Sequence, residues 1–193
     1  MAIERFVSKF RLGEEPGNAV VWKNYSASER VSALESIRRE YHLNKYGAEP
    51  RLQELLELLN KNGVKYLVVG GYSVAIHGHP RYTKDIDIWI LTNRENAVSL
   101  IQALDDFGFG SFGLSVTDFE TPGHVVQLGN APARIDILTS LTGVDFDACW
   151  QNKIYVEGEG LIYPVISLND LRTNKRALAR HQDLADLEQL GDD

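Results

Sequence analysis

Cysteine and long hydrophobic runs are what this sequence lacks most. Its 193 residues contain one cysteine, Cys149, so no disulfide bond can form within the chain, and we expect the reducing cytoplasm as its compartment. No apolar run approaches the ~18 residues of a membrane-spanning helix, and residues 1–5 lead directly into mixed polar sequence instead of a secretory signal. These absences predict a cytoplasmic protein without a membrane partner.

The chain also lacks an excess of positive charge. With 20 Lys and Arg against 27 Asp and Glu, its formal net charge is −7, which argues against a broad basic face that grips long nucleic acid. Local basic clusters occur at Arg38-Arg39 and in a C-terminal group made of Arg172, Lys175, Arg176 and Arg180. Composition therefore disfavours a nucleic-acid substrate without excluding one.

Helical and strand-like patterns alternate along the chain. A capping box, Ser26–Glu29, opens a helix over about 27–43, and further helices are expected at 52–61, 93–104, 168–178 and 184–190. Strands are expected at 65–69, 85–90, 124–128, 134–138, 154–156 and 161–163. This order predicts the α/β class (α+β in stricter use), with a mixed β-sheet flanked by helices. We divide the chain into an N-terminal helical extension, 1–47, and a main domain, 48–193.

Two glycines end the first of these strands. The buried strand 65–69 runs straight into Gly70 and Gly71, and glycine lets backbone N–H groups approach a ligand closely. A short helix is expected to begin near Ser73, and the N-terminus of a helix favours phosphate. The junction therefore predicts a phosphate-binding turn.

Three aspartates occur in strand-like surroundings after this turn. Asp85 and Asp87 are two residues apart and so share one face of a strand, while Asp136 lies between Ile135 and Ile137 in another strand. An isolated Asp-Ile-Asp strand is more often a solvated edge, but the preceding glycines favour a site. Three such carboxylates repel one another without a cation, and their hard oxygens suit Mg²⁺ or Mn²⁺. Sites of this kind catalyse in-line displacement at phosphorus.

Together these residues resemble the nucleotidyltransferase superfamily that includes DNA polymerase beta. The shared pattern is an apolar residue, Gly-Gly, about a dozen residues, Asp-x-Asp and a later Asp on a strand. Within the superfamily the sequence is most similar to the bacterial abortive-infection type II toxins (AbiEii-like) and related small enzymes. The likeness extends over roughly 52–190, because it includes the C-terminal motifs around Lys175 and Asp183; residues 1–47 are outside it.

The resemblance implies a role for each site residue. Asp85, Asp87 and Asp136 would bind the metal ions, with Asp136 also accepting the proton of the acceptor hydroxyl. A triphosphate-binding group would comprise Gly70, Gly71, Ser73 and Lys175. Lys84 and Arg81 would steer the nucleotide or simply solvate their loop. Asp183 and Asp186 would orient Lys175 or Arg180 rather than bind metal.

The implied activity is metal-dependent transfer of a nucleoside monophosphate from an NTP to an acceptor hydroxyl. Similarity to the toxins implies RNA, especially a tRNA 3′ end, as acceptor and a cognate antitoxin as partner, with Arg172, Arg176 and Arg180 as phosphate contacts. A protein hydroxyl or an aminoglycoside-type small molecule is the rival acceptor. A non-catalytic nucleotide-binding or antitoxin-type regulatory module is the alternative from another class.

Overall fold

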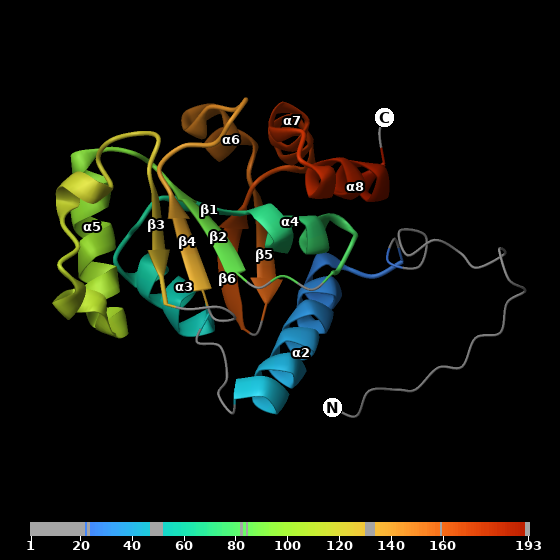
Figure 1. Cartoon of the computed structure of the whole chain (residues 1–193), viewed down its shortest axis with the longest axis horizontal. Coiled ribbons are helices and arrows are strands. Elements are labelled where there is room, and N and C mark those ends of the chain that lie inside the picture. Colours follow the sequence, from blue (N-terminus) through green and yellow to red (C-terminus); the bar gives the residue numbers. More distant parts are fainter. Residues whose placement is uncertain are drawn as a thin grey trace, which may run out of the picture.

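The structure is a computed structural model that describes most of the chain. The described residues are 22, 24–46, 52–81, 83, 85–129, 134–158 and 160–191. They form a mixed β-sheet with helices packed around it, so the predicted fold class is confirmed (Figure 1).

The sheet has six strands in the order β3-β4-β2-β1-β6-β5. They are β1 (Tyr66–Val69), β2 (Asp85–Ile90), β3 (Val125–Leu128), β4 (Arg134–Leu138), β5 (Ile154–Gly158) and β6 (Leu161–Val165). The hairpins β3–β4 and β5–β6 are antiparallel, as is β1–β2, whereas β2 runs parallel to β4 and β1 parallel to β6. The central strand β1 is buried along its whole length.

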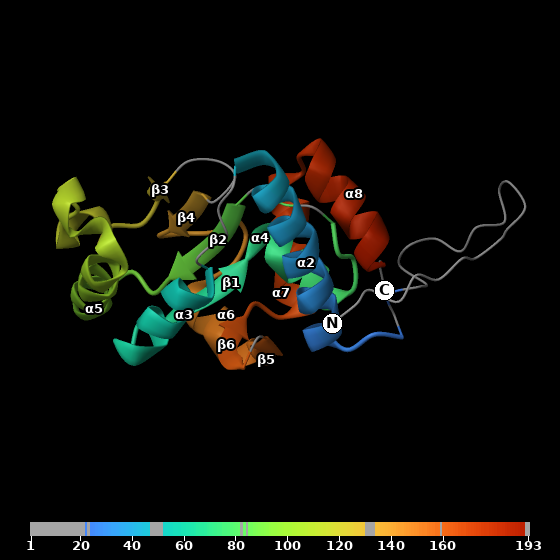
Figure 2. The same cartoon turned by 90° about the horizontal axis from the view of Figure 1, so that it is seen from below.

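Two groups of helices cover the sheet. The helices are α2 (Ala27–Tyr46), α3 (Leu52–Lys61), α4 (Gly70–His77), α5 (Arg94–Leu104), α6 (Phe146–Asn152), α7 (Leu168–Leu178) and α8 (His181–Leu190). Helix α3 packs with α5 and β6, whereas α4 packs with α2, α7 and α8. Figure 2 shows these groups apart, with α5 toward one end of the molecule and α8 toward the other. No described helix is both long enough and apolar enough to cross a membrane.

Helix α2 joins the N-terminal extension to the common core. Its predicted capping box forms, because the Ser26 hydroxyl accepts from the Glu29 N–H at 3.2 Å and the Ser26 N–H donates to the Glu29 carboxylate at 2.7 Å. Leu34 is fully buried, and the Tyr72 hydroxyl of α4 donates to Glu35 at 2.5 Å. The boundary at residue 47 stays a prediction, but Val31 and Leu34 of α2 belong to the same core as the sheet.

Candidate active site

Parallel pairing of β2 and β4 brings the three aspartates together. In this register Asp85 lies beside Arg134, and Asp87 lies beside Asp136. Because side chains alternate along a strand, these four residues share one face of the sheet. The opposite face carries isoleucines of both strands, Ile86, Ile88, Ile90, Ile135 and Ile137, all of them buried. The apolar core therefore fixes the register that gathers the acids.

Arg134 is a site residue that the sequence analysis did not select. Its Nε and Nη2 donate to the two Asp136 oxygens at 2.7 and 2.9 Å, and Nη2 also donates to Asp85. The guanidinium thus joins two of the three predicted metal ligands. Within the described ranges, no three His, Cys, Asp or Glu side chains form a ready metal-binding group. The period-two pattern on β4, which puts Arg134 on the face of Asp136, was the signal that could have identified it.

The ionised form of Asp87 is disfavoured in this arrangement. Burial, followed by the nearby charges of Asp85 and Asp136, raises its pKa to about 6, although the Gly71 N–H and the charge of Lys175 act in the opposite direction. A carboxylate surrounded by two others is stabilised by added positive charge. Hard carboxylate oxygens suit a divalent cation, and the binding of one by Asp85, Asp87 and Asp136 stays a prediction.

Gly70 permits the closest approach between the turn and the acids. Its φ is +61°, and a Cβ built on it would lie 1.9 Å from Oδ2 of Asp87. Any other residue here would displace the carboxylate. Helix α4 starts at Gly70, three residues earlier than predicted near Ser73, and the Gly71 N–H donates to Asp87.

The remaining predicted nucleotide ligands are placed differently. Ser73 is fully buried, and its hydroxyl donates to the Gly70 carbonyl oxygen at 2.8 Å. In this arrangement the hydroxyl is engaged within α4, so its contact with a nucleotide stays a prediction. Lys84 lies outside the described residues.

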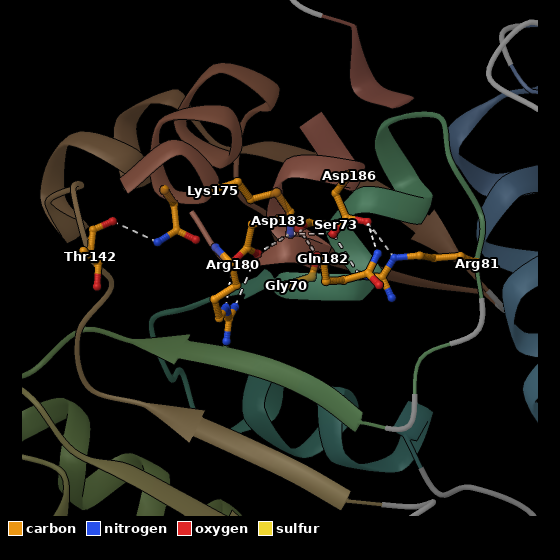
Figure 3. A network of polar contacts seen from close by, with 10 residues as sticks. Gly70, Ser73, Arg81, Thr142, Lys175, Arg180, Gln182, Asp183 and Asp186 are labelled. Carbon is orange, nitrogen blue, oxygen red and sulfur yellow. Dashed lines mark hydrogen bonds and ion pairs between the residues drawn. The ribbon is translucent and has the colours of Figure 1, made fainter. Parts of the chain in front are cut away.

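Lys175 lies at the centre of a buried ion cluster between α7 and α8. Its ammonium group donates to Asp183 at 3.1 Å and to Asp186 at 2.7 Å, and the exposed fractions of the three side chains are 5%, 2% and 1%. Arg180 pairs with Asp183 at 2.6 Å, and Arg81 pairs with Asp186 at 2.7 Å. Figure 3 shows Arg180 and Arg81 on opposite sides of the aspartates. The acids thus hold Lys175, Arg81 and Arg180 in place.

Positive charge outweighs negative charge in this ion cluster. Burial alone would raise the pKa of Asp183, but Arg180 and Lys175 hold it below its usual value. Arg81 and Lys175 likewise lower the pKa of Asp186 in spite of its burial. Two carboxylates therefore face three cations, and the surplus positive charge lies beside the predicted phosphate-binding turn.

An open cleft of about 200 Å³ lies between Asp87 and α7. It is lined by Val69, Gly70, Asp87, Leu138, Ser140, Leu141, Thr142, Asn174, Leu178 and Arg180. Its volume is smaller than the roughly 300–1,000 Å³ of most small-molecule sites. Apolar walls, the Asp87 carboxylate and an exposed guanidinium thus share one cavity, which suits a ligand with an apolar part and an anionic part.

This fold and this site define a nucleotidyltransferase, an enzyme that transfers nucleotidyl groups. A sequence model of the aminoglycoside-2''-adenylyltransferase family matches residues 51–170, more than half of the chain, and the protein belongs to that family. Among solved structures, a Thermotoga maritima protein described as a candidate nucleotidyltransferase has a TM-score of 0.51 and 22% identity, over 72% of this chain and 88% of that one. That likeness concerns the fold alone. No curated protein matches this sequence.

Proposed function

We propose that the protein transfers a nucleoside monophosphate from an NTP to a hydroxyl of a small, amine-bearing acceptor of the aminoglycoside type. The acceptor oxygen attacks the α-phosphorus, the bond from that phosphorus to the bridging oxygen breaks, and pyrophosphate leaves. The single observation that carries the transfer chemistry is the in-register pairing of Asp87 with Asp136, beside a glycine turn that contacts Asp87.

Each charged group has a separate task in this scheme. Mg²⁺ or Mn²⁺, held by Asp85, Asp87 and Asp136, would supply the positive charge that stabilises the phosphoryl oxygens in the transition state. Asp136 accepts the proton of the attacking hydroxyl. Arg180, whose side chain is 70% exposed at the rim of the cleft, contacts the departing pyrophosphate. Lys175, being buried, acts as a positioning residue for the pair of aspartates that hold Arg180 and Arg81.

Two observations support a small cationic acceptor. The family description names an aminoglycoside, a polyhydroxylated molecule with amino groups. The chain also carries a formal net charge of −7, which favours a cationic acceptor over a polyanion.

The basic surface predicted for RNA is weaker than the sequence suggested. Arg172, one of its three arginines, is only 7% exposed, and its Nη2 donates to the Leu190 carbonyl oxygen at 2.9 Å. It holds α7 to the end of α8 and presents no charge for a phosphate, so that part of the prediction was wrong.

RNA remains a second candidate acceptor because of the two other arginines. Arg176 and Arg180 are both exposed, and Arg180 lines the catalytic cleft. A 3′ end that reached the cleft would pass these charges. The similarity to the toxin-like branch, with its tRNA acceptor and antitoxin partner, points in the same direction.

Label transfer separates the two acceptors. The protein is incubated with each α-labelled NTP and Mg²⁺, together with a panel of aminoglycosides, total cellular RNA or total protein. We expect labelled aminoglycoside and no labelled polymer. Label on a tRNA-sized band would show that RNA is the acceptor. In that case Arg176→Glu should reduce the labelling of RNA. If none of the acceptor pools becomes labelled although the protein binds NTP, the result would favour the alternative of a regulatory module.

A further inference from the structure

Asn174 is a nearly buried amide that faces the cleft without a full set of hydrogen bonds. It lies on α7, is 6% exposed and belongs to the lining of the cleft. Its amide nitrogen donates to the Thr142 carbonyl oxygen at 2.9 Å. No described residue donates to its Oδ1. Although the residue is nearly buried, this oxygen is accessible at the cleft, where it can accept from a ligand that brings an N–H group.

The orientation of this amide is fixed by chemistry. A backbone carbonyl oxygen only accepts hydrogen bonds, so the NH₂ end of Asn174 must face Thr142, and Oδ1 must face the other way. The loop that carries Thr142 is held tightly against α7, because a Cβ added at Gly143, whose φ is +81°, would lie 2.6 Å from the Cβ of Ala177. Figure 3 shows Thr142 at the end of the network away from Arg81.

Apolar side chains surround the same part of the cleft. The lining includes three leucines, Leu138, Leu141 and Leu178, together with Gly70, Asp87 and Arg180. A nucleotide could pack its planar base against the leucine side chains and direct its phosphates toward Gly70 and Arg180.

We propose that Asn174 Oδ1 selects the nucleobase by accepting a hydrogen bond from an exocyclic amino group. This inference rests on the proposed function and assigns to one residue the contact that would distinguish amino-bearing bases, such as adenine and cytosine, from their keto counterparts. In hypoxanthine and uracil a keto oxygen replaces that amino group. It would face Oδ1 as a second acceptor, so the pair would repel and both oxygens would lose water without gaining a donor.

Two matched pairs of nucleotides test the proposal directly. ATP and ITP differ at the amino-to-keto position of the purine, and CTP and UTP differ at the equivalent position of the pyrimidine. Dissociation constants are measured by isothermal titration calorimetry with Mg²⁺ and the full-length protein. We expect the amino member of the better-bound pair to bind about tenfold more tightly than its keto partner.

The Asn174→Ala variant gives the sharper result. This substitution should weaken binding of the amino-bearing nucleotide and leave binding of its keto partner unchanged or improved. The two dissociation constants should then agree to within about twofold. Thr173→Ala is the matched control: it removes a bond to the Asn169 carbonyl oxygen, 3.0 Å long, from the neighbouring position of α7, and should keep the ratio.

The outcomes separate this inference from the proposed function. Equal binding of both members by the wild-type protein would overturn the role of Asn174, as would an equal loss of affinity for both in Asn174→Ala. Either result would leave nucleotidyl transfer intact, because label transfer measures that separately. A preserved amino preference in a protein that transfers no label would instead count against the proposed function alone.

Discussion

Replacing Asp87 by asparagine should stabilise the fold at neutral pH while abolishing catalysis. The pKa of Asp87 is raised from 3.8 to about 6, first by burial and then by Asp85 and Asp136. A carboxyl group with a raised pKa holds its proton more tightly in the folded than in the unfolded protein. Its contribution to stability is therefore greatest below pH 4 and is lost as pH rises through about 6.

The size of the effect follows from the shift. A difference of about two pH units corresponds to about 3 kcal/mol of folding free energy, as an upper bound. Asparagine cannot ionise, keeps an oxygen for the Gly71 N–H and offers N–H groups to the neighbouring carboxylates. We therefore expect Asp87→Asn to match the wild-type protein near pH 4 and to exceed its stability by up to ~3 kcal/mol at pH 8.

Urea unfolding from pH 4 to 8, in EDTA and without nucleotide, measures this difference. Asp118→Asn is a control of opposite sign, because the backbone N–H and hydroxyl of Ser115 lower the pKa of Asp118. That variant should lose stability above pH 4 relative to wild type. If Asp87→Asn were no more stable than wild type at pH 8, the three carboxylates would not be coupled as described.

The remaining predictions concern packing and the buried ion cluster. Leu34→Ala on α2 should destabilise the protein by about 2–5 kcal/mol in urea unfolding, since the side chain is fully buried; a loss under ~1 kcal/mol would show that α2 is not part of the core. Lys175→Met should cost about 3 kcal/mol or more, because Asp183 and Asp186 lose a buried cation. Lys61→Met is the control, because Lys61 is exposed and lies 3.8 Å from its acidic partner; it should change stability by under ~1 kcal/mol. Equal losses in Lys175→Met and Lys61→Met would show that the buried ion cluster does not stabilise the fold.

Local pattern was enough to predict the elements that carry the site. Alternation along 85–90 and 134–138 identified both acidic strands, and the glycines after 65–69 identified the turn. The parallel pairing of β2 with β4 could not be predicted, because each strand has apolar residues that several partners would cover. That pairing is what places Arg134 between Asp85 and Asp136.

Features that depend on distant parts of the chain escaped prediction. The predicted division at residue 47 separates α2 from the main domain, yet Glu35 contacts Tyr72 across 37 positions. Arg172 belonged by sequence to a basic cluster, and only its packing against Leu190 reveals a structural role. The orientation of Asn174 depends on a loop that lies 32 positions away in the chain.

The most direct test of the central claim is pyrophosphate release by Asp136→Asn, measured beside NTP binding. The claim is that Asp85, Asp87 and Asp136 form one catalytic centre in which Asp136 receives the proton of the acceptor. The wild-type protein with Mg²⁺, NTP and its acceptor should release pyrophosphate, and EDTA should stop it. The variant should bind NTP with an affinity near that of wild type but turn over at least ~100-fold more slowly. Unchanged turnover in this variant would contradict the account.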